Sequence, residues 1–142
     1  MVASVAYDSV EVGDLIAAQS FSLSRLSLVM YAGASGDFNV IHWNERIAKS
    51  VGLPDVIAHG MLTMAEAIRV VTDWVGDPGA VREYGVRFTR PVVIPDDDTG
   101  SVVEVSGKVA EKRPDGTVRI DLTATFNGST VLGRAQALVA LP

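Results

Sequence analysis

The stretch from Gly60 to Val75 constrains the fold of this chain most, because apolar side chains cover nearly the whole circumference of the helix that it predicts. A helix that is apolar on nearly every side has to be buried on nearly every side. The rest of the chain must therefore supply elements that wrap around it. The residues that interrupt the apolar surface are Thr63, Glu66, Arg69, Thr72 and Asp73.

The second half of the chain can supply this wrapping, because it has the two-residue period of half-buried strands. From Val118 to Phe126, apolar residues alternate with polar ones. An Asp-Gly pair at 115–116 and an Asn-Gly pair at 127–128 favour tight hairpins on either side. Further strands are expected near 19–23, 81–89, 103–109 and 131–139. We predict that residues 1–142 form a single α+β domain, in which a curved antiparallel sheet of about five strands wraps around a long central apolar helix. This arrangement is the hot-dog fold.

Two shorter helices are expected ahead of the long one. Ser24 is a suitable N-cap for the first, which should end in Gly33 and Gly36. Asn44 is a suitable N-cap for the second, over 45–51, which Gly52 closes. These helices flank the segment that carries the candidate chemistry of the chain.

Asp37 and His42 are the candidate reacting groups. They stand five positions apart, which places them neither side by side on a helix nor on one face of a strand, so we expect a loop. An aspartate and a histidine on a loop can share a proton-transfer task, since histidine titrates close to neutral pH. In the alternative interpretation, Asp37 caps a turn and His42 fills a gap in the core. Spacing alone does not decide between the two.

Composition argues against several functional classes. The chain has no cysteine, which excludes disulfides, thiol nucleophiles and thiolate metal sites. Its two histidines lack a local ligand spacing, so no metal or other cofactor is expected. The net charge of −5 argues against a nucleic-acid partner. No apolar run is long enough to cross a membrane, and we expect a cytoplasmic protein because no secretory segment stands at the N-terminus.

Two blocks of the sequence form a recognisable pattern. The first block, over 31–48, supplies the motif residues Tyr31, Ser35, Gly36, Asp37, Asn39, His42 and Ala48. The second block covers residues 57–62. The two blocks, in this order, resemble the MaoC-like family of (R)-specific hydratases and dehydratases. The chain departs from the family pattern at Val40, where proline is usual, but this change removes no reacting group.

The resemblance extends to one branch of this family. Segments 74–80 and 84–89 are similar to the catalytic B subunit of the actinobacterial (3R)-hydroxyacyl-acyl carrier protein dehydratase of type II fatty-acid synthesis. This similarity implies a catalytic subunit that pairs with a related hot-dog subunit, in elongation of the mycolic-acid type. The acyl chain length is not implied.

The resemblance also implies roles for individual residues. His42 would take the C2 proton of a (3R)-3-hydroxyacyl thioester, and Asp37 would help protonate the leaving hydroxyl, although the division between acid and base stays open. The backbone N–H of Gly60 would stabilise the charge on the thioester oxygen. Asn39 would brace the loop, and His59, which has no role in the motif, is interpreted as structural. An acyl channel is one interpretation, and ordinary core packing the other, of Met61, Met64, Ile68, Trp74, Tyr84 and Phe88.

Two other functions remain open at this stage. One is a homodimeric (R)-specific enoyl-CoA hydratase, which differs in carrier and partner, and the other is a non-catalytic hot-dog scaffold subunit. The expected substrate is therefore an acyl carrier protein thioester or a coenzyme A thioester. We also expect a homodimer or a heterodimer, because the sheet would leave a long edge strand unpaired. Candidates for docking an acidic carrier are Arg82, Arg87 and Arg90.

Overall fold

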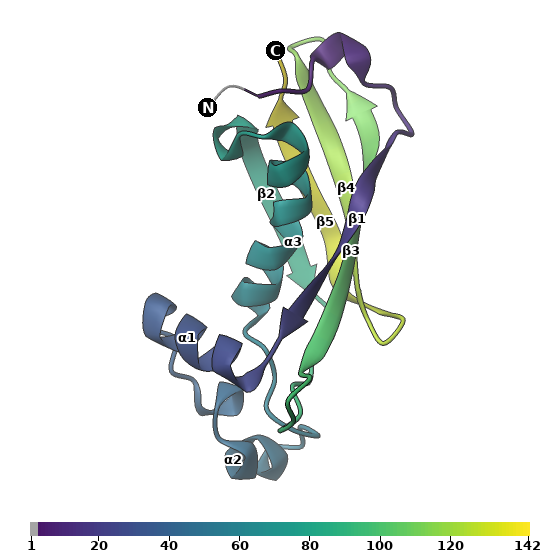
Figure 1. Ribbon diagram of the computed structural model, residues 1–142. Helices are drawn as coiled ribbons and strands as arrows, with labels where there is room; N and C mark the ends of the chain where they lie inside the picture. The colour runs from purple at the N-terminus through teal and green to yellow at the C-terminus, as the bar shows by residue number, and fades with distance from the viewer. Residues whose placement is uncertain (1–2) are drawn as a thin grey trace.

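A five-stranded antiparallel sheet curves around helix α3 (Gly60–Val75) in the computed structural model, which describes residues 3–142 (Figure 1). This arrangement confirms the predicted α+β hot-dog fold. The strands lie in the order β1-β3-β4-β5-β2, so β1 and β2 form the two edges. Their bounds are Leu15–Leu23 for β1, Val81–Phe88 for β2, Ser101–Lys112 for β3, Thr117–Phe126 for β4 and Ser129–Ala140 for β5.

The two predicted hairpins join the central strands. Gly116, at the turn between β3 and β4, has a φ of 81°. Asn127 and Gly128, between β4 and β5, have φ angles of 48° and 73°, as a tight hairpin turn requires of both central residues. The local turn chemistry therefore sets the register of the strands that form the middle of the sheet.

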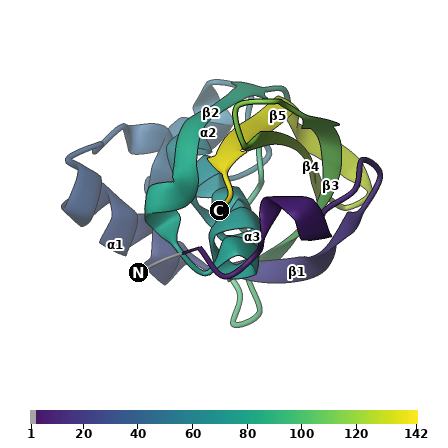
Figure 2. The same cartoon turned by 90° about the horizontal axis from the view of Figure 1, so that it is seen from above.

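Helix α3 is buried on one side only, so the expectation of burial on nearly every side is wrong. The sheet reaches around only part of the circumference, as the view along the helix shows (Figure 2). The fully buried side consists of Leu62, Thr63, Ala67, Val70, Val71 and Val75. An exposed line of residues at four-residue spacing runs along the helix: Met61, Ala65, Arg69 and Asp73.

Helices α1 (Arg25–Ser35) and α2 (Glu45–Ser50) lie beyond the N-terminal end of α3 (Figure 1). Ser24 and Ser27 form a reciprocal capping box at the start of α1, and Gly36 ends that helix in the left-handed conformation at φ 76°. The side chain of Asn44 caps α2 by accepting the N–H of Ile47. Such side-chain caps contribute about 1 kcal/mol each. Both short helices therefore form where the sequence predicts them.

No helix in the described range 3–142 combines the length and the apolar character that crossing a bilayer requires.

Candidate active site

Asp37 lies in a short loop that its own side chains hold in shape. Its N–H donates to the hydroxyl of Ser35 at 3.2 Å, and its Oδ1 accepts the N–H of Asn39 at 3.1 Å. The Oδ1 of Asn39 then accepts the N–H of Ile41 at 3.3 Å. Asn39 is thus engaged with the backbone of the loop. The predicted loop ends in a short helical turn. Val40–His42 form a single 3-10 turn, designated η2, and Asn39 is its N-cap.

His42 is buried, and a backbone contact determines which of its nitrogens carries the proton. Its Nδ1 lies 2.7 Å from the carbonyl oxygen of Ile57, which can only accept a hydrogen bond. The proton therefore belongs on Nδ1, and Nε2 keeps a free lone pair. Burial is the main cause that lowers the pKa of His42 below 6.5, and nearby His59 lowers it further, against opposing effects of the Ile57 contact and Asp37. A neutral imidazole with a free Nε2 is suited to act as a base.

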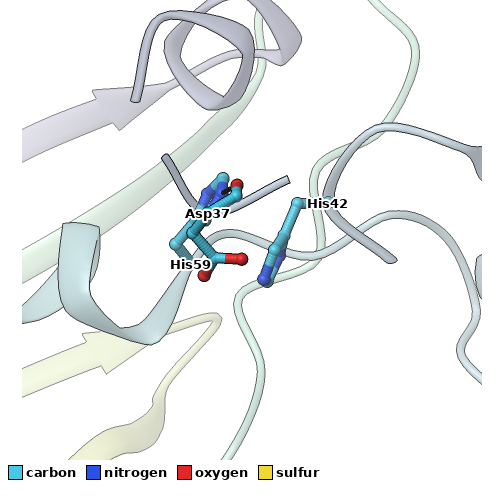
Figure 3. Close-up of side chains that lie close together, drawn as sticks. All are labelled: Asp37, His42 and His59. Carbon is cyan, nitrogen blue, oxygen red and sulfur yellow. Dashed lines mark hydrogen bonds between the residues drawn. The ribbon is translucent and has the colours of Figure 1, made fainter. Parts of the chain in front are cut away.

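His59 lies against both candidate groups, although the sequence indicates only a structural role for it. Its ring stacks on that of His42, with 3.8 Å between the ring centroids, and it lies edge to face with the ring of Tyr31 at a centroid distance of 4.8 Å. Its Nε2 lies 3.1 Å from the backbone carbonyl oxygen of Asp37. Figure 3 shows the three side chains together. The sequence places His59 directly before the predicted central helix, but its contacts with Asp37, His42 and Tyr31 depend on the tertiary structure.

The same three side chains do not suit a metal ion. One ligand atom from each of Asp37, His42 and His59 lies within 4.8 Å of the others. The histidine rings, however, are inclined by only 23°. The lone pairs of imidazole lie in the ring plane, so those of the two stacked rings lie in separate, nearly parallel planes, which is unfavourable for binding one ion between them. The arrangement fits proton transfer better than metal coordination.

A cavity of about 430 Å³ opens beside Asp37 and His42. Its wall also includes the start of α3, with Gly60 and Met61, and the end of β2, with Phe88. Most of its other lining residues are apolar. These residues include Leu53, Ile57, Ala58, Pro91, Val92, Val131 and Leu132. The cavity therefore combines an apolar wall with a few polar groups, as small-molecule sites usually do.

Gly60 gives this cavity a backbone donor at the first position of α3. The amides of Leu62 and Thr63 both donate to the carbonyl of His59, whereas the first amides of a helix have no partner within it. A Cβ atom at Gly60 would lie 2.9 Å from the ring of Phe88. Glycine thus allows the ring of Phe88 to lie close to this helix end, where the helix dipole favours negative charge.

Only two of the six residues considered for an acyl channel, Met61 and Phe88, line the cavity. Tyr84 instead donates its hydroxyl to the carbonyl of Met64 at 2.9 Å, and burial raises its pKa to about 12. Ile68 and Trp74 pack against the hydrophobic core. For most of the six, core packing is therefore the better interpretation.

The three arginines considered for carrier docking do not form one surface. Arg90 lines the cavity of Asp37 and His42. Arg87 lines a separate depression with Arg134, and Arg82 lines a third beside Asp77 and the C-terminal residues. The register of β2 is irregular between Val81 and Glu83 and between Gly85 and Arg87, and Arg90 lies beyond the end of the strand.

Known proteins of similar sequence include hydratases and dehydratases, in agreement with a site suited to proton transfer. The family model described as "MaoC like domain" matches residues 11–125. An (R)-specific enoyl-CoA hydratase from Rhodospirillum rubrum is 33% identical over 122 residues, which cover 85% of this chain and 81% of that protein.

Two further similarities involve longer proteins. The 3-hydroxyacyl-thioester dehydratase X of Mycobacterium tuberculosis is 48% identical over 65 residues, which are 46% of this chain and 22% of that protein. A solved structure described as a MaoC-like dehydratase is 43% identical, with a TM-score of 0.93, over 96% of this chain and 42% of that one. The chain thus matches less than half the length of both relatives.

Proposed function

Because this chain belongs to the MaoC-like domain family, we propose that it is a hydro-lyase that interconverts (3R)-3-hydroxyacyl thioesters and trans-2-enoyl thioesters. One observation carries this proposal above the others. The proton of His42 is held on Nδ1 by the carbonyl of Ile57, so its Nε2 is free to accept a proton beside Asp37 and the apolar cavity.

In the dehydration direction, one proton leaves C2 and one hydroxyl leaves C3. Nε2 of His42 accepts the C2 proton, and the electron pair moves toward the thioester carbonyl, whose oxygen the N–H of Gly60 stabilises. The C3–O bond then breaks as the C2–C3 double bond forms, and the hydroxyl departs as water with a proton donated by the Asp37 carboxyl, which the proton taken up by His42 replaces. In hydration the two groups hold the attacking water and return a proton to C2. If Asp37 is instead the base and His42 the acid, the same bonds form and break and the same number of protons moves.

The test is hydration of a crotonyl thioester by the purified chain. The reaction is monitored as the decrease in absorbance of the conjugated enoyl thioester. We expect turnover by the chain alone or together with the subunit that co-purifies with it. Absence of turnover in both preparations, with folded protein, would contradict the proposal and favour a scaffold subunit. The burial of His42 beside a carboxylate argues against a scaffold, because polar groups are costly to bury.

The finer proposal is that the chain is the catalytic subunit of an acyl carrier protein-dependent dehydratase in type II fatty-acid elongation. The similarity of segments 74–80 and 84–89 supports this assignment. An (R)-specific hydratase of coenzyme A thioesters remains the second candidate, supported by the relative from Rhodospirillum rubrum. Both candidates use the same chemistry, so the carrier has to be determined by experiment.

Replacing Arg82, Arg87 and Arg90 singly by alanine should distinguish a docking residue from solvated ones. We expect Arg90→Ala to raise KM for a carrier-protein substrate several-fold and to weaken its dependence on salt, because Arg90 lies at the cavity and carrier surfaces are acidic. Arg82→Ala, in a different depression, is the matched control. Equal losses in the three variants would contradict a specific role for Arg90, and no loss in any of them would show that the docking surface lies elsewhere, including on a partner subunit.

We also propose that the chain assembles into a homodimer or pairs with a related hot-dog subunit. Strand β2 is an edge of the sheet that pairs only with β5, and two apolar side chains, Phe88 at the end of β2 and Met61 in α3, are each 55% exposed. Light scattering coupled to gel filtration should therefore give at least the mass of a dimer. A stable monomer, both alone and mixed with co-purified partners, would contradict this expectation.

A further inference from the structure

His59 contacts both members of the proposed catalytic pair by different interactions. It stacks on the ring of His42, and its Nε2 lies 3.1 Å from the carbonyl oxygen of Asp37 (Figure 3). A carbonyl oxygen only accepts, so Nε2 of His59 carries the proton and donates it to this bond. The residue directly precedes Gly60, the first residue of α3. One side chain thus connects the Asp37 loop, the His42 ring and the start of the central helix.

The position of His59 excludes direct contact with a substrate in this arrangement. Its side chain is 1% exposed, and it is absent from the lining of the cavity, to which both Asp37 and His42 contribute. Its Nδ1 is buried without a hydrogen-bond partner among residues 3–142. An unpaired buried nitrogen has a cost in stability, which a purely structural position could avoid with an apolar ring of similar size.

We propose that His59 is a positioning residue, which holds the Asp37 loop through its Nε2–H and fixes the ring of His42 by stacking. This inference rests on the proposed hydro-lyase function. The cavity then receives two reacting groups whose relative placement is determined from behind by one buried side chain. Such placement matters because small displacements of reacting groups lower rates strongly.

The stacked ring also affects the titration of His42. The titratable groups around His42 are Asp37 and His59, with Tyr31 against His59 and Arg90 on the same cavity. Burial lowers the pKa of His42 most, His59 lowers it further, and Asp37 raises it. Replacing His59 by a neutral side chain removes one lowering effect. The pKa of His42 should then rise, and the acid side of the activity profile should move to higher pH.

Two substitutions separate the two interactions. His59→Phe keeps an aromatic ring against His42 but has no donor for the Asp37 carbonyl. His59→Gln keeps an N–H donor but has no ring to stack. We expect His59→Phe to lower kcat about 10-fold or more with little change in KM, since His59 does not touch substrate. We expect His59→Gln to recover part of kcat, while both variants show the shifted acid limb.

Tyr7→Phe provides the control for loss of a partly buried polar group. Tyr7 donates its hydroxyl to the carbonyl of Arg113 at 2.9 Å, and neither residue lines the cavity of Asp37 and His42. The control should lose stability without any shift of the pH profile. A structural role for His59 alone would produce the same result as this control.

A titration followed by NMR of the imidazole signals tests the inference without relying on activity. The chain has only two histidines, so the His59 variants leave His42 as the single imidazole signal. We expect its midpoint to lie at higher pH in both variants than in the unchanged protein. Unchanged midpoints together with unchanged kcat would overturn the inference. If His59→Phe does not fold, His59→Gln decides by the same criteria. A shifted midpoint in a protein that never hydrates a thioester would instead leave His59 coupled to His42 and contradict the proposed function.

Discussion

Asp37→Asn and His42→Gln are each expected to reduce hydration of a crotonyl thioester by about 10²-fold or more while the protein stays folded. Each change removes a group that gains or loses a proton and roughly preserves its shape. The amide oxygen of asparagine can still accept the N–H of Asn39, so the loop should keep its form. The double variant should lose much less than the sum of the two effects in free energy, because the pair acts as one unit. Steady-state kinetics with circular dichroism as a folding check measures both.

Asp115→Asn is the control that the chain offers for Asp37→Asn. Asp115 also accepts the N–H of the residue two positions ahead, Thr117, in a turn far from the cavity. Its pKa is lowered mainly by its hydrogen bonds from Thr117. The control should keep the full rate of hydration. A normal rate in Asp37→Asn or His42→Gln would contradict the assignment of the pair.

Gly60→Ala is expected to lower kcat by about 10-fold or more while the protein stays folded. The new methyl group would lie 2.9 Å from the ring of Phe88 and would narrow the approach to the first amide of α3. Displacement of the Phe88 ring has a cost in stability, so thermal unfolding has to show that the variant is folded at the temperature of the assay. Thermal unfolding and kcat should be measured on the same preparation.

A variant that combines Gly60→Ala with Phe88→Ala separates two causes of the loss of kcat. If the new methyl group acts only by crowding Phe88, this combined variant should have the same rate as Phe88→Ala alone. If it blocks the approach of the thioester oxygen to the amide, the loss from Gly60→Ala should persist in the combined variant. A wild-type rate in Gly60→Ala would remove the proposed role of this helix end.

Local patterns were sufficient to predict most of the fold. The alternation in 118–126, the two Gly-containing turns and the capping residues Ser24 and Asn44 each act within a few positions of the chain. The structure therefore has its strands, turns and short helices at the positions that these local patterns predict. The burial of α3 was overestimated because periodicity reveals which residues are apolar, but not how far a sheet reaches around them.

The candidate site was predictable only in part. Asp37, His42 and Gly60 were found through their motifs, and the structure places all three on one cavity. The contact of His59 with Asp37 joins residues 22 positions apart, and no local pattern contains this information. The separation of Arg82, Arg87 and Arg90 was missed because it depends on strand orientation and on where β2 ends.

The most direct test of the account is the product formed from a crotonyl thioester in deuterated water. Addition of water through His42 and Asp37 on one wall of the cavity predicts a single stereoisomer, the (3R)-3-hydroxybutyryl thioester, with one deuterium at C2. Chiral chromatography and mass spectrometry measure both properties. A racemic or (3S) product, or no product from the folded protein with its co-purified partner, would contradict the proposed function.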